Sequence, residues 1–183
     1  MILNHKPIKI YQMEKENKDK GDYAEKYFIR VVKDNHPTAV ITKATRDEDM
    51  KQHWDYRIND MTFDVKAEKG THSRGMTSIE FTARSGLDGW VYGEANFIAF
   101  MSGASFICAI PEELVELCYK KVILKKRDNV SNTDALYHLI NTPDKWGQQR
   151  DLIMLVTYQD ILDLKSTKII YKKNDILIND KLN

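Results

Sequence analysis

Asp55, Asp64 and Lys66 are the residues of this sequence best suited to chemistry, because they fall within one short stretch at strand-like spacing. On both sides of Asn59-Asp60, apolar and charged residues alternate, which is the period-2 pattern of two half-buried β-strands. Asn59-Asp60 itself has the composition of a two-residue hairpin turn. We therefore expect a β-hairpin whose apolar side packs on the core and whose charged side is displayed.

The turn sets the register of this hairpin and decides which side chains meet. It pairs Tyr56 with Phe63 and places Asp55 directly opposite Asp64. Like charges that face each other across a strand pair destabilise it. Mg²⁺ prefers a few carboxylate oxygens together with water and phosphate, so a cation between the two acids would remove the conflict. Lys66 projects from the same side as Asp64, since alternate residues of a strand share a face.

Two acids and a lysine at this spacing are suited to phosphodiester hydrolysis. That reaction needs charge stabilisation on a phosphate oxygen, an activated water and help for the leaving alkoxide, and metal ions held by acids contribute to all three. A neighbouring ammonium neutralises developing charge or orients the attacking water. The alternative is that Asp64 and Lys66 form only a solvent-facing ion pair.

Length and charge limit the class of protein. The 183 residues suffice for one domain with a full core. Lys and Arg number 28 against 27 Asp and Glu, a formal charge of +1, so any nucleic-acid contact must come from a local patch. The polar, glycine-containing segment 68–75 is expected to be a loop beside the charged face. Lys69, Arg74 and Arg84 form the best phosphate-contacting set near it.

Cysteine usage and hydropathy favour a soluble cytoplasmic protein. Cys108 and Cys118 lie in or beside apolar segments without ligand spacing, as reduced thiols do. No run of roughly 20 apolar residues is present for a membrane helix, and the amino terminus lacks the apolar run of a signal peptide. We expect no membrane partner and no organic cofactor.

An amphipathic helix is expected over residues 22–34, where apolar residues recur at helical spacing. Residues 1–20 are interpreted as a polar lead-in and 21–183 as a single domain, because 13–22 are almost all polar or charged. Glu25 falls at the edge of the apolar stripe, where a carboxylate faces inward. Alternatively, Asp22 and Glu25 form a capping box that only satisfies the helix start.

The rest of the chain reads as an α/β domain. Pro111 opens a helix over 111–121, a second helix is expected after residues 132–134, and 161–164 are a short helical stretch. Gly86 and Gly89 mark a turn. Besides the hairpin, strands are expected at 38–42, 78–82, 97–100, 106–110, 152–156 and 169–171.

The chain resembles the PD-(D/E)XK nuclease superfamily on residues that occur in the order of that group's motif. Glu25 matches the acid of the first helix, Asp55 the acid of the central hairpin, and Asp64-Val65-Lys66 the acid-x-lysine triplet. The segment Gly89-Trp90-Val91-Tyr92-Gly93 followed by 97–100 is similar to small phage-type members. The resemblance covers roughly residues 21–110, and Trp54 stands where the motif has proline.

This resemblance implies a fold, a cofactor and roles. The fold would be a central mixed β-sheet flanked by helices, and the cofactor Mg²⁺ or Mn²⁺. Asp55, Asp64 and the Val65 carbonyl would hold the metal, Lys66 would lie beside the attacking water, and Glu25 would be an auxiliary ligand or orient water. The expected activity is a DNA endonuclease, often a homodimer, acting in the host cytoplasm if the chain is phage-encoded.

Two other functions stay open, and three further residues are weaker candidates. One alternative is a nuclease-fold binding or anti-defence protein without catalysis; the other is an RNA- or nucleotide-directed hydrolase that uses the same site. Glu68 and Glu80 would each add a ligand, although pairing with a neighbouring lysine explains them equally. His72 would assist proton transfer, although loop histidines are commonly solvated.

Overall fold

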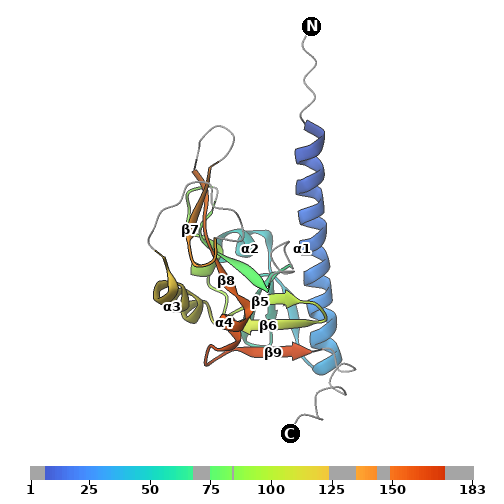
Figure 1. The fold of residues 1–183 in the computed structure, drawn as a ribbon. Coiled ribbons are helices and arrows are strands. Elements are labelled where there is room, and N and C mark those ends of the chain that lie inside the picture. The colour runs from blue at the N-terminus through green and yellow to red at the C-terminus, as the bar shows by residue number, and fades with distance from the viewer. Residues whose placement is uncertain (1–6, 68–74, 84, 124–134, 144–148, 172–183) are drawn as a thin grey trace.

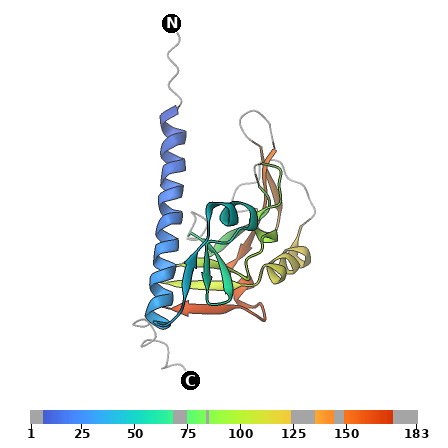
Figure 2. The same ribbon diagram turned by 180° about the vertical axis from the view of Figure 1, so that it is seen from behind.

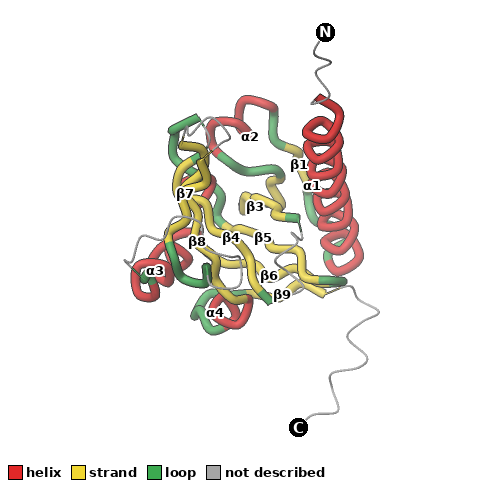
Figure 3. Tube along the Cα trace, turned by 45° about the horizontal axis from the view of Figure 1, so that its top comes forward, coloured by secondary structure: helices red, strands yellow, loops and turns green. Residues whose placement is uncertain are grey.

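The fold is α/β, with a central mixed β-sheet between two layers (Figures 1 and 2). Helix α1 runs along one face, while a second, three-stranded sheet lies on the other side with α3 and α4 (Figure 3). The expected fold class is confirmed. The computed structural model describes residues 7–67, 75–83, 85–123, 135–143 and 149–171.

The central sheet has six strands in the order β1-β2-β3-β5-β6-β9. Neighbouring strands pair antiparallel except β3 and β5, which are parallel and set Val65 beside Ala99. The segment between β3 and β5 contains β4, which joins the other sheet. The six strands are β1 (Ile41–Lys43), β2 (Tyr56–Ile58), β3 (Met61–Lys66), β5 (Phe97–Ser102), β6 (Ser105–Ala109) and β9 (Lys168–Tyr171).

Helix α1 (Pro7–Asn35) covers one face of this sheet with the apolar stripe that the sequence predicts. Ala24, Phe28 and Val31 are fully buried against strand residues such as Val65. The helix begins at Pro7 instead of near residue 22, so the predicted boundary is wrong. Lys and Glu, abundant between residues 14 and 20, are good helix formers, and the absence of apolar periodicity there concealed the helix.

The opposite face is covered by a mixed layer. Its sheet runs in the order β4-β8-β7, and its core residues include Ile79, Leu114 and Met154. No helix among the described residues is long and apolar enough to cross a membrane. The elements of this layer and its surroundings are α2 (Arg46–Gln52), β4 (Met76–Thr82), the 3₁₀ helix η2 (Trp90–Tyr92), α3 (Pro111–Lys121), β7 (Leu139–Pro143), β8 (Gln149–Thr157) and α4 (Tyr158–Leu162).

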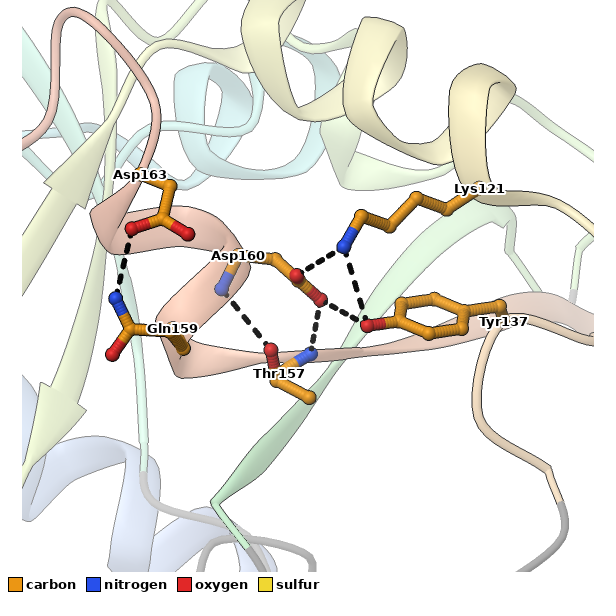
Figure 4. A network of polar contacts seen from close by, with 6 residues as sticks. All are labelled: Lys121, Tyr137, Thr157, Gln159, Asp160 and Asp163. Atoms are coloured by element: carbon orange, nitrogen blue, oxygen red, sulfur yellow. Dashed lines mark hydrogen bonds and ion pairs between the residues drawn. The ribbon is translucent and has the colours of Figure 1, made fainter.

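A network of hydrogen bonds and one ion pair connects α3 to α4 within this layer (Figure 4). The Asp160 carboxylate pairs with the Lys121 ammonium and accepts hydrogen bonds from the Tyr137 hydroxyl at 2.6 Å and the Thr157 amide at 3.1 Å. Burial alone would raise the pKa of Asp160, but these hydrogen bonds outweigh burial and hold it below its usual value. Lys121, Tyr137, Thr157 and Asp160 are each paired within this network, so its role is structural.

Several predicted elements need correction. The first strand begins at Ile41 instead of 38, and the last short helix is α4, which begins at Tyr158. The helix expected after residues 132–134 is wrong in its described part, because β7 occupies Leu139–Pro143. There, the chain pairs with β8, whose apolar residues supply a long-range partner that local propensity cannot anticipate.

Candidate active site at the β2–β3 hairpin

The hairpin has the predicted register. Tyr56 pairs with Phe63 and Ile58 with Met61, and Asn59 adopts the left-handed conformation (φ 52°) that a tight turn requires. Asp55 lies immediately before β2, and its N–H donates at 2.8 Å to the carbonyl of Phe63, the residue already paired with Tyr56. The paired register ends at Tyr56 and Phe63, so the expected direct pairing of Asp55 with Asp64 is not part of the ladder. The two carboxylates still lie close enough for the charge of Asp64 to raise the pKa of Asp55.

The Asp55 carboxylate crosses toward β3. Its Oδ2 accepts a hydrogen bond of 2.6 Å from the Val65 N–H. In an extended strand, the N–H and C=O of one residue leave the backbone on the same edge, so the Val65 carbonyl also points toward the Asp55 side. One carboxylate and one carbonyl thus converge beyond the start of β2.

Asp64 and Lys66 face away from α1. Val65 packs against α1, and alternation sends its two neighbours to the other face, where Trp90 lies. Asp64 is only 4% exposed, so the expectation of a displayed charged side is wrong. The reason is that the second layer covers this face, which a hairpin pattern alone does not show.

The Lys66 ammonium lies between a carboxylate and an aromatic ring. Its Nζ is 2.7 Å from Asp64 Oδ2 and 4.8 Å from the centroid of the buried Trp90 ring. The ion pair is mostly enclosed rather than solvent-facing, since the Lys66 side chain is 23% exposed. No hydrogen bond of good geometry reaches the buried Asp64 Oδ2 from the residues that the structure describes.

Burial shifts both acids toward the protonated form. Desolvation, and then the charge of Asp64, raise the pKa of Asp55 to about 7, against the lowering effect of the Val65 amide and of Lys66. Burial also raises the pKa of Asp64, although Lys66 and His53 oppose it. A bound cation would relieve the repulsion between the two neighbouring carboxylates and favour their ionised forms.

Glu25 lies near this group but pairs elsewhere. Its Oε2 is 2.9 Å from Lys43 Nζ and accepts a 3.3 Å hydrogen bond from the Tyr56 hydroxyl. Its charge contributes to the raised pKa of Asp55. The capping-box alternative is excluded, because Asp22 lies well inside α1. Whether Glu25 is a metal ligand stays a prediction.

Sequence reasoning missed the residues that enclose the site. His53 ends α2 in the left-handed conformation (φ 55°), two residues before Asp55. Gly93 packs so tightly against it that an added Cβ would lie 2.5 Å from the Cβ of His53. The glycines that flank Trp90 in sequence were a usable signal of this close packing. Local sequence carries no comparable signal for His53.

Trp54, at the place of the motif proline, has a structural role. It is 3% exposed, and its indole N–H donates to the Gln52 side chain at 2.9 Å. The Arg57 guanidinium lies 5.3 Å from the centroid of its ring. Trp54, which replaces the motif proline, is therefore part of the hydrophobic core.

Of the other predicted site residues, the structure describes only Glu80. Glu80 lies on β4, in the second sheet, and is partly buried. The remaining candidates lie outside the described residues: Glu68, Lys69, His72, Arg74 and Arg84.

The residues present fit a metal site of limited size. Within the described part of the chain, no three His, Cys, Asp or Glu side chains gather closely enough to hold a metal by themselves. Mg²⁺, however, commonly uses one or two carboxylates and keeps several waters. Asp55, Asp64 and the Val65 carbonyl meet that requirement, and Asp64 Oδ2 already has the Lys66 ammonium 2.7 Å away but no hydrogen bond of good geometry within the described residues.

Comparison of the chain with family models, curated proteins and solved structures finds no match. The resemblance to PD-(D/E)XK nucleases therefore depends on the motif residues and their arrangement alone.

Proposed function

We propose that this chain is a metal-dependent DNA endonuclease of the PD-(D/E)XK type. The observation that supports this most is the convergence of Asp55 and Asp64 at one end of the hairpin, with the Lys66 ammonium 2.7 Å from Asp64. A mixed sheet with α1 on one face is consistent with such an enzyme.

Each residue has a role that its position permits. Asp55, Asp64 and the Val65 carbonyl would hold Mg²⁺ or Mn²⁺, which when bound activates water and offsets charge on phosphate oxygens. The Lys66 ammonium neutralises charge that develops on a phosphate oxygen and orients the attacking water. Glu25 lies on the α1 side, away from Asp64 and Lys66, so its proposed contribution is electrostatic: its charge helps to raise the pKa of Asp55.

A binding protein without catalysis is the second candidate. Its support is the pairing of Glu25 with Lys43, which leaves two acids rather than three at the hairpin. A two-carboxylate site is still sufficient for Mg²⁺, so we favour the enzyme.

The test is nicking and linearisation of supercoiled plasmid with Mg²⁺ or Mn²⁺. Wild type should cleave, while Lys66→Ala and Asp64→Asn should lose about 100-fold or more of the rate. Lys51→Ala and Asp47→Asn are matched controls, because these residues form an exposed ion pair on α2. Equal activity in all five folded proteins would indicate a contaminant. Competition with RNA separates a DNA enzyme from the RNA-directed alternative.

A further inference from the structure

A second feature of the molecule is a cavity of about 330 Å³ that Tyr92 of η2 helps to line. Strands β4, β7 and β8 line it from the sheet, and α3 and η2 from the sides. Ligand pockets in proteins run from about 300 to 1,000 Å³. Its size therefore suits a ligand of one or two rings.

Three aromatic side chains line the cavity together with aliphatic ones, and two of the three rings are accessible. Phe81 and Tyr92 are in ring contact, with centroids 6.1 Å apart and planes tilted by 56°. Tyr92 is 46% exposed and Tyr119 is 71% exposed. Exposed rings around a concave apolar surface offer stacking area that the fold itself does not use.

The polar groups of the cavity are acceptors and hydroxyls. Asp88 is exposed, and it is the one charged side chain among the described residues that line the cavity. Burial raises the pKa of Tyr92, and the neighbouring Tyr119 and Asp88 raise it further. A few polar groups that converge on an apolar pocket are the usual means of orienting a ligand.

This chemistry excludes several occupants. A phosphate would meet the Asp88 charge, with no cation among the described lining residues to offset it. A compact ammonium ion would pair with Asp88 but would leave the apolar walls of the cavity unfilled. An aliphatic group would leave both the carboxylate and the stacking surfaces unused. A flat neutral ring that carries N–H donors satisfies both the aromatic walls and the acceptor.

We propose that this cavity binds a nucleobase, which stacks on Tyr119 and Tyr92 and donates hydrogen bonds to Asp88. Nucleobases stack on aromatic side chains whatever their sequence, and their amino groups donate to carboxylates. The base belongs either to a free nucleoside or to an unpaired position of a nucleic-acid strand.

The position of η2 favours a nucleic-acid strand as the source of the base. Trp90 contacts the Lys66 ammonium, and Tyr92, two residues further along η2, lines the cavity. A nucleic-acid strand whose phosphate approaches Lys66 thus passes close to the cavity. Base binding itself requires no cleavage, so this inference goes beyond the proposed nuclease activity.

The test uses the fluorescence of 2-aminopurine, which stacking against an aromatic side chain quenches. The probes are 2-aminopurine riboside and a single-stranded oligonucleotide with one internal 2-aminopurine, both with a chelator present so that metal-dependent cleavage plays no part. Wild type should quench in a saturable manner. Tyr119→Ala should weaken binding by about 10-fold, and Asp88→Asn by about 5-fold. Tyr119 and Asp88 are exposed, so neither substitution disturbs the core.

Tyr23→Ala is the matched control, because Tyr23 is a 59% exposed tyrosine on α1, away from the cavity. It should bind both probes as wild type does. Tighter binding of the oligonucleotide than of the riboside indicates a strand, and equal binding indicates a free nucleoside; both support a base site. The absence of saturable quenching, or equal quenching by wild type and both cavity variants, would overturn the proposal.

Discussion

The Asp55 carboxyl is held at the start of β2 by the Val65 amide, 2.6 Å away, while burial and the Asp64 charge raise its pKa to about 7. An ordinary unfolded aspartate has a pKa near 3.9. The folded protein therefore binds more protons than the unfolded chain between about pH 4 and pH 7. Asp55 thus makes the metal-free protein less stable as the pH rises through that window.

The first prediction concerns this pH dependence. Between pH 5 and pH 8, metal-free wild type should lose about 2 kcal/mol of unfolding free energy through Asp55; the full shift corresponds to about 4 kcal/mol, and partial solvent exposure reduces it. Asp55→Asn should lack this loss and be the more stable protein at pH 8. Urea denaturation at several pH values measures both. Parallel pH profiles for the two proteins would contradict the proposed environment of Asp55.

Trp90 is a positioning residue, since its ring lies 4.8 Å from the Lys66 Nζ that pairs with Asp64. A cation–π contact of this kind contributes about 0.5–2 kcal/mol. If the chain is a nuclease, Trp90→Leu should lower kcat by about 10-fold with little change in KM, whereas Trp90→Phe, which keeps an aromatic face, should restore most of the rate.

Val91→Ala separates this effect from a loss of packing, because Val91 is a buried η2 residue outside the Lys66 contact. It should destabilise the fold and keep kcat. A Trp90→Phe enzyme as slow as Trp90→Leu would show that the ring does not act through Lys66.

At the scale of elements, local periodicity accounts for much of what the sequence predicted. Alternation and the Asn59-Asp60 turn predicted the hairpin register, and Pro111 marked the start of α3. The periodic signal failed where an element lacks an apolar stripe, as at the start of α1 from Pro7. The enclosure of Asp64 was not predictable, because it depends on β4 and β8, which pair across some 70 residues of sequence.

Substitutions at two glycines compare a tightly packed backbone position beside η2 with an open position on α1. A Cβ at Gly89 would lie 2.3 Å from the Glu80 carbonyl oxygen, so Gly89→Ala forces the backbone of β4 or η2 to move. It should cost about 2–4 kcal/mol of unfolding free energy. Gly21 lies within α1 with nothing within 4 Å of an added Cβ. Gly21→Ala should stabilise the protein by about 0.5–1 kcal/mol.

Chemical denaturation of both variants measures the two effects against one wild type. If Gly89→Ala were as stable as wild type, Gly89 would not be packed tightly against the β4 backbone. If Gly21→Ala were destabilising, α1 would not be an ordinary helix at that position.

At the scale of the whole molecule, two apolar clusters lie on opposite faces of the central sheet. Asp64 and Lys66 project into the face covered by the second layer, and Glu25 comes from α1 on the other. The candidate site thus lies where both layers meet the hairpin. Light scattering would detect the homodimer that the resemblance implies.

The central claim is that Asp55 and Asp64 together hold a divalent metal, and Mn²⁺ calorimetry in two buffers of different ionisation enthalpy tests it most directly. Wild type and the exposed control Asp47→Asn should bind Mn²⁺, whereas Asp55→Asn and Asp64→Asn should bind at least about 10-fold more weakly. Because the pKa of Asp55 is about 7, binding should release about one proton at pH 6 and little at pH 8. No binding by wild type, or equal affinity in all four proteins, would contradict the account.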